Sequence, residues 1–79
     1  MGKIQARERD PVLSAFGLAV QRRRKMLQLS QEEAAEQVGL NRTYFADIER
    51  GARNVGLRNI VRIARGLGVA VSTLLRDVR

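Results

Sequence analysis

Residues 30–50 read SQEEAAEQVGLNRTYFADIER, and the organisation of the whole chain follows from them. Ser30 and Glu33 form the pattern of a capping box, in which each side chain satisfies the other residue's backbone N–H. A helix is therefore predicted to begin at Gln31. Gly39 tolerates the positive φ at which many helices end, so this helix should end just before it.

A second helix is predicted directly after this turn. Asn41 is a favourable N-cap, and Gly51 provides a suitable end. The small residues Ala34 and Ala35 fall where the two helices would touch. The pattern therefore predicts two short helices joined by a three-residue turn.

The flanking sequence predicts three more helices. Asp10 and Pro11 have the types favoured at an N-cap and a first helical position, and Gly56 and Gly68 bound an apolar pattern over residues 57–67. A last short helix carries apolar residues at helical spacing: Val71, Leu74, Leu75 and Val78. No convincing alternating strand pattern is present, so the fold class is all-α with five helices.

The chain divides into a short arm and one domain. Residues 1–9 are mostly polar and charged, which predicts a flexible basic arm. Residues 10–79 contain the helical pattern and no linker, which predicts a single compact domain.

Composition excludes several kinds of function. The 79 residues include no Cys and no His, so thiol chemistry, the common zinc sites and an imidazole base are absent, and neither a metal nor a cofactor is predicted. A domain this small is not expected to build an enzyme cleft. The sequence lacks an apolar run of membrane-spanning length and a secretory leader, so we expect no membrane partner and a cytoplasmic protein.

The net charge of +7 favours a polyanionic partner, and its distribution is uneven. Residues 1–29 have seven basic against two acidic side chains, and residues 57–79 have five against one. Residues 30–56 have three against five. The central pair of helices should therefore recognise bases rather than bind by charge, while the flanking helices bind phosphates. The alternative is that the arginines only solvate helix faces.

Arg24 interrupts an apolar helical stripe between Val20 and Leu27. A partly buried guanidinium is tolerated when a carboxylate meets it with bidentate geometry. We predict a structural ion pair between Arg24 and Glu49.

The run LSQEEAAEQVGLNRTYFADIERG, followed by LRNIVRIARGLGV, resembles the Cro/repressor-type (XRE) helix-turn-helix transcriptional regulators. The resemblance implies a lambda-repressor-like fold in which the second and third of five helices form the motif. More narrowly, NRTYFADIERGARNVGL resembles the controller proteins of restriction-modification systems. This implies a non-enzymatic regulator that binds double-stranded DNA and controls its own operon. A phage-type repressor and the DNA-binding antitoxin of a toxin-antitoxin pair are the alternatives.

In the docking mode of this family, the second helix of the motif reads bases from the major groove. Carried onto this chain, the base contacts are Arg42, Thr43 and Asp47. Arg42 has the fork that suits guanine, although a phosphate contact is its alternative. Asp47 could accept from cytosine, or could instead repel wrong sequences or orient Arg42.

The resemblance also implies contacts to the DNA backbone. Gln31 lies at the positive end of its helix, where a phosphate is favoured. The other expected backbone contacts are Asn41, Tyr44, Arg53 and Asn54. Tyr44 could lie against the core instead. Arg53 and Asn54, in the loop that follows, could form a solvated turn.

One copy covers too few base pairs for a selective regulator, so the resemblance implies a homodimer on a pseudo-palindromic operator. The expected interface residues are Ile63, Val69, Val71 and Leu74, whose alternative place is the core. RNA polymerase is a further expected partner if the protein activates transcription. The basic arm is the one candidate segment for an antitoxin-like partner.

Overall fold

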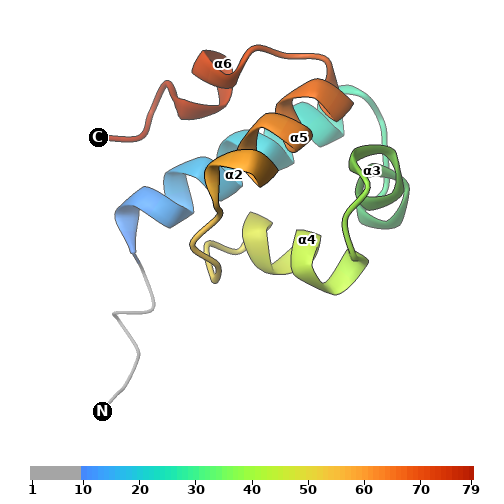
Figure 1. The fold of residues 1–79 in the computed structure, drawn as a ribbon, viewed down its shortest axis with the longest axis horizontal. Coiled ribbons are helices and arrows are strands. Elements are labelled where there is room, and N and C mark those ends of the chain that lie inside the picture. Colours follow the sequence, from blue (N-terminus) through green and yellow to red (C-terminus); the bar gives the residue numbers. More distant parts are fainter. Residues whose placement is uncertain (1–9) are drawn as a thin grey trace.

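The computed structural model describes residues 10–79, and every regular element in this range is a helix (Figure 1). The elements are α2 (Pro11–Met26), α3 (Gln31–Val38), α4 (Arg42–Glu49), α5 (Leu57–Leu67) and α6 (Val71–Leu75). The all-α, five-helix prediction is confirmed. The predicted arm at residues 1–9 lies outside the described residues.

The ends of the flanking helices follow the predicted capping signals. The Asp10 carboxylate accepts from the backbone N–H groups of Val12 and Leu13 at 2.9 and 3.3 Å, and Pro11 occupies the first helical position. Gly68 ends α5 in the left-handed conformation, with φ +72°. These local signals set where α2 begins and where α5 ends.

The last helix is shorter than its apolar pattern predicts. α6 ends at Leu75, while Val78 lies in the turn beyond it and packs, half-buried, against the core. The Val78 N–H donates to the carbonyl of Leu75 at 3.0 Å. A single turn is therefore enough to bring this side chain to the core, and the helix need not continue.

The helices pack in two groups that share one core. α2 lies against α4 and α6, and α3 lies against α4 and α5. Figure 1 shows α4 at one edge of the molecule and α6 at the opposite edge. The largest side chains with no more than 1% exposure come from four of the five helices: Val20, Phe45, Ile48, Ile63, Leu67 and Leu74. The core therefore holds α4 from one side and leaves its outer face free.

Gly17 permits a close approach of two helix backbones. A Cβ at this position would lie 2.3 Å from the carbonyl oxygen of Ile48 and 2.7 Å from that of Glu49. Both distances are shorter than any normal contact, so α2 can lie this near the end of α4 only because residue 17 has no side chain. This contact helps to fix the position of α4.

Candidate nucleic-acid interface

α3 and α4 form the predicted helix pair, separated by a turn of three residues. The Ser30 Oγ accepts from the Glu33 N–H at 3.0 Å, and the Glu33 carboxylate accepts from the Ser30 N–H at 2.8 Å. Gly39 ends α3 with φ +76°, and the Asn41 side chain accepts from the Tyr44 N–H at 3.1 Å. The capping box, the glycine end and the second N-cap are all confirmed.

Two of the three predicted base-reading residues open α4. Arg42 and Thr43 are exposed at the first and second positions of the helix. The Asn41 cap fixes the start of this helix, so the backbone of both residues is held in one orientation from which their side chains can reach a ligand. Asn41 uses its side-chain oxygen in that cap, which leaves the amide nitrogen as its polar group for a phosphate.

The third predicted base reader, Asp47, is held by two arginines. Its carboxylate accepts one hydrogen bond from Arg50 and another from Arg53, the latter at 3.3 Å. The hydrogen bond from Arg50 is the main reason that the pKa of Asp47 lies below its usual value, while desolvation acts in the opposite sense. The carboxylate orients Arg50 and Arg53, so the alternative that it orients Arg42 is not what the structure shows.

Arg50, which pairs with Asp47, was not among the site residues predicted from the sequence. It is exposed at the C-cap of α4, three residues after its partner Asp47. The i, i+3 spacing of opposite charges on one helix was the signal that could have identified it.

Tyr44 lies against the core, which is one of the two alternatives left open by the sequence, while a phosphate contact stays a prediction. The ring is half-buried against the core, and its hydroxyl oxygen accepts from the Asn59 side chain at 3.2 Å. The Arg53 guanidinium lies 5.3 Å from the ring centroid, within range of a cation–π interaction. The hydroxyl keeps its own hydrogen as a donor. Tyr44 and Arg53 therefore form one cluster with Asp47.

Asn54 is placed differently from its neighbour Arg53. It lines a groove that also includes Val12 and Phe16 of α2 and Leu75 of α6. The structure therefore brings Arg53, but not Asn54, into the cluster around Asp47. A backbone contact by Asn54 stays a prediction.

A buried ion pair supports the interface from behind. The Arg24 Nε and Nη2 donate to the Glu49 carboxylate at 2.6 and 3.0 Å, and Arg24 Nη1 donates to the carbonyl of Leu29 at 2.9 Å. The hydrogen bond with Glu49 raises the pKa of Arg24 above its ordinary value, which keeps the guanidinium ionised. The predicted pair is confirmed, and it joins α2 to the end of α4.

Gln31 is attached to the same carboxylate. Its side-chain nitrogen donates to Glu49 Oε1 at 3.0 Å, from the first position of α3. An amide nitrogen has a second hydrogen, and the backbone N–H at a helix start has no partner within its helix. Gln31 is therefore held in one orientation with donors available for an anion.

The expected dimer contacts need a correction. Ile63 and Leu74 are 0% and 1% exposed, so they belong to the core of a single copy. Neither can contact a second copy while this packing persists. Val69 and Val71 are half-buried, which leaves them partly accessible.

Residues 10–79 contain neither a cluster of metal ligands nor a membrane-spanning helix. No three carboxylate, histidine or cysteine side chains gather there as metal ligands would. None of the helices in this range is both long and apolar enough to cross a membrane.

Comparisons with known proteins agree with this geometry. The helix-turn-helix family model (HTH_3) matches residues 20–74 of the chain. The control protein C.MunI from a Mycoplasma species is 46% identical over 56 residues, which cover 71% of this chain and 76% of that protein.

Solved structures show the same architecture. The restriction-modification controller protein C.AhdI from Aeromonas hydrophila superposes with a TM-score of 0.80 and 38% identity, covering 82% of this chain and 98% of that one. The controller protein C.Esp1396I, solved as a tetramer with its natural 35 base-pair operator, gives a TM-score of 0.77 at 27% identity and covers 87% and 96%. The chain belongs to the helix-turn-helix (HTH_3, XRE-type) family of DNA-binding regulators.

Proposed function

We propose that this protein is the controller of a restriction-modification operon, and that it binds a pseudo-palindromic DNA operator as a homodimer to regulate its own transcription. The observation that carries the proposal is the exposed start of α4, where Arg42 and Thr43 extend from a helix capped at Asn41 and held from behind by Glu49. The likeness to the control protein C.MunI and to C.AhdI supports the narrower assignment.

In this proposal α4 lies in the major groove and its first residues meet the base edges. Arg42 pairs with guanine O6 and N7, and Thr43 offers a hydroxyl or a methyl group to the next base. Asp47 acts mainly by holding Arg50 and Arg53 towards the DNA, since both of its oxygens already accept hydrogen bonds from them.

Contacts to the DNA backbone then lie on both sides of α4. Gln31 meets a phosphate at the start of α3, where the partial positive charge of the helix end adds to its hydrogen bonds. Asn41, Tyr44, Arg53 and Asn54 supply the remaining backbone contacts. These contacts position α4 and carry no sequence information themselves.

Dimerisation follows from the size of the interface. One α4 reaches only a few base pairs, and a two-fold axis doubles the site on a palindromic operator. We propose Val69 and Val71 as members of the interface, since both are partly accessible, Val69 just before α6 and Val71 at its first position. RNA polymerase is a proposed further partner at promoters that the protein activates, and the cytoplasm is the compartment that this function requires.

The proposal is tested by fluorescence anisotropy at a fixed salt concentration close to physiological. A duplex from directly upstream of the gene for this protein is compared with a shuffled duplex of the same composition. Specific regulators prefer their sites by about 10³-fold or more, and a preference of this size is expected. Equal weak binding to both duplexes would contradict autoregulation. A preferred site in an unrelated operon, with none near restriction-modification genes, would favour the phage-type repressor instead.

A further inference from the structure

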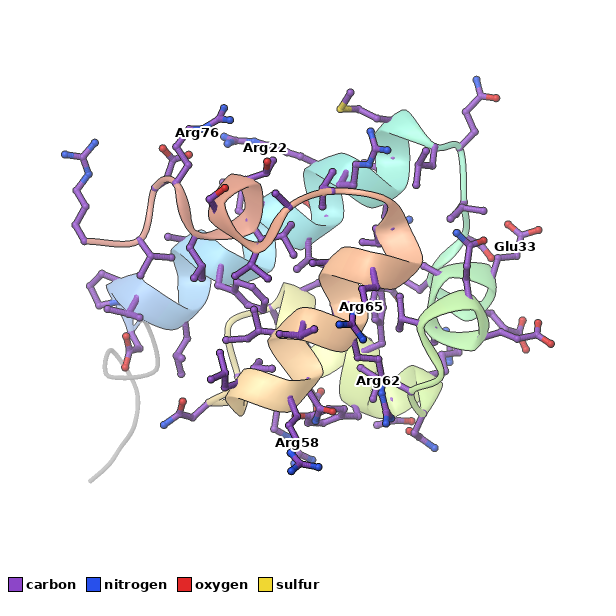
Figure 2. All side chains as sticks on the ribbon, turned by 45° about the horizontal axis from the view of Figure 1, so that its top comes forward. Arg22, Glu33, Arg58, Arg62, Arg65 and Arg76 are labelled. Atoms are coloured by element: carbon purple, nitrogen blue, oxygen red, sulfur yellow. The ribbon has the colours of Figure 1, made fainter. Side chains whose placement is uncertain are left out.

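α5 presents a row of arginines to solvent. Arg58, Arg62 and Arg65 recur at i, i+4 and i+7, are exposed, and border a shallow depression together with Leu57 and Val61. α5 contains no Asp or Glu, and within residues 10–79 no carboxylate forms an ion pair with any of the three. Figure 2 shows Arg58 and Arg62 projecting towards the edge of the molecule, while Arg65 lies nearer its middle. The two exposed guanidinium groups nearest the start of α5, those of Arg58 and Arg62, have the chemistry of an anion-binding surface.

Two hydrogen bonds fix the first half of α5 beside the helix-turn-helix. Arg62 Nη1 donates to the carbonyl of Gly39, in the turn that leads into α4, at 3.4 Å. Asn59 Nδ2 donates to the hydroxyl of Tyr44 in the first turn of α4 at 3.2 Å. Arg58 precedes Asn59, so it lies at the same end of α5.

α3 and α5 approach α4 from different sides. Gln31 of α3 contacts Glu49, whereas Asn59 of α5 contacts Tyr44. Glu49 and Tyr44 are five positions apart, which places them roughly 140° apart around a helix of 3.6 residues per turn. A helix in the major groove has a phosphate backbone along each side. If Gln31 lies beside the phosphates of one DNA strand, the start of α5 lies beside the phosphates of the other strand.

We propose that Arg58 and Arg62 bind phosphates of the DNA strand on the α5 side of the groove, as a second grip that matches Gln31 on the α3 side. The inference rests on the proposed DNA-binding function. Arg58 and Arg62 are one helical turn apart, and their long side chains can adapt to successive phosphates. Guanidinium groups bind phosphate oxygens in bidentate fashion, which strengthens the match.

The charge balance of the helix-turn-helix explains why such a grip is needed. Residues 30–56 have more acidic than basic side chains, and Arg50 and Arg53 share the Asp47 carboxylate. The segment that reads bases therefore has a net negative charge, which opposes rather than favours the approach of a polyanion. α5 supplies positive charge directly beside it.

The test is the salt dependence of DNA binding. Each phosphate contact contributes about 0.9 to the slope of log K against log salt. The affinities of the wild type, Arg58→Gln, Arg62→Gln and the double variant are measured by anisotropy from low to physiological salt. Because a substitution removes its contact from both copies of the proposed homodimer, each single variant should lower the slope by about 1.8 and the double variant by about 3.6.

Two variants with the same loss of charge serve as controls. Arg65→Gln removes a charge one turn further along α5, and Arg76→Gln removes one near Arg22 at the opposite edge of the molecule (Figure 2). Both should leave the slope unchanged. Arg62→Lys, which keeps the charge, should retain the wild-type slope. Circular dichroism and sedimentation establish that each variant is folded and has the mass of the wild type.

Two duplexes separate this inference from the proposed function. One is selected from a random pool by the wild-type protein, and the other is its shuffled counterpart. A wild type with no preference between them would defeat the proposed regulator, whatever the slopes show. The wild type could instead show a clear preference while the salt slopes of Arg58→Gln and Arg62→Gln equal those of the two controls. That result would overturn the proposed phosphate contacts and leave the proposed regulator intact. The same slopes would result if the row bound an acidic protein instead of DNA.

Discussion

Arg24 and Glu49 form a bidentate ion pair inside the domain, with distances of 2.6 and 3.0 Å and side chains that are 11% and 1% exposed. The pair connects α2 to the last residue of α4, and the same carboxylate accepts from Gln31 at the first residue of α3. One buried acid of α4 thus contacts two other helices, α2 and α3. The orientation of both helices of the motif therefore depends on it.

Glu49→Ala should lower the free energy of unfolding by about 3–5 kcal/mol, because the guanidinium of Arg24 would stay buried without its partner. Urea denaturation at neutral pH measures the loss. Glu36→Ala removes an exposed carboxylate from α3 and should change stability by less than about 0.5 kcal/mol. Equal effects of the two variants would show that the buried pair has no special role.

At Gly17 and Gly39, substitution by Asn and by Ala should destabilise the protein in opposite orders. At Gly39 a side chain meets nothing within 4 Å, but φ is +76°, a conformation that Asn tolerates better than Ala. Gly39→Asn should therefore be less destabilising than Gly39→Ala. At Gly17 any Cβ collides with the carbonyl of Ile48, so the larger Asn should be worse than Ala. Thermal melting of the four variants checks the order, and the same order at both positions would contradict it.

Local signals in the sequence predicted most of the fold. Ser30 with Glu33, Gly39 and Asn41 each act on the backbone within a few residues, so their effects could be read without the tertiary structure. The partner of Arg24 was also predictable, because a cation on an apolar stripe requires an acid at the facing position.

Two features depended on tertiary packing and could not be decided from the sequence. Ile63 is predicted as an interface residue with the core as its alternative, and it is fully buried because α5 contacts α3, α6 and α2 together, which widens the buried face of α5 beyond one stripe. The partners of Asp47 include Arg53, which belongs to a loop whose path the sequence does not specify. Apolar residues at helical spacing indicate which face of a helix is buried, but they do not show how many other helices pack against it.

Ile63→Asp and Val69→Asp should separate folding from assembly. Ile63 has no exposed surface, and even its replacement by Ala should cost about 2–5 kcal/mol, so the aspartate variant should lose helical circular dichroism. Val69 is partly exposed, and its aspartate variant should remain helical. Sedimentation should show a smaller mass for Val69→Asp than for the wild type. An unchanged mass would remove Val69 from the proposed interface.

The stability contributed by Asp47 should depend on pH. Its pKa is lowered in the folded protein, chiefly by the hydrogen bond from Arg50, so its contribution is present above the unfolded pKa of about 3.9 and is lost as the pH falls through the folded pKa. Wild type should exceed Asp47→Asn in stability at neutral pH, with a gap that closes in acid. Because the group is near the surface, added salt should also narrow the gap. A difference that is constant from neutral pH to acid would contradict the assignment.

Arg42→Ala should change sequence preference rather than general affinity. If Arg42 forms a bidentate contact with guanine, its loss should reduce the discrimination against substitution of that base pair by about 1–3 kcal/mol. Anisotropy with the preferred duplex and with single-base variants of it measures this discrimination. Arg53→Ala is the matched control, since loss of a phosphate contact from both copies of the dimer should weaken all duplexes equally and lower the salt slope by about 1.8. Uniform weakening by Arg42→Ala would instead make Arg42 a phosphate contact, and recognition would then depend on Thr43 and the residues that follow it on the outer face of α4.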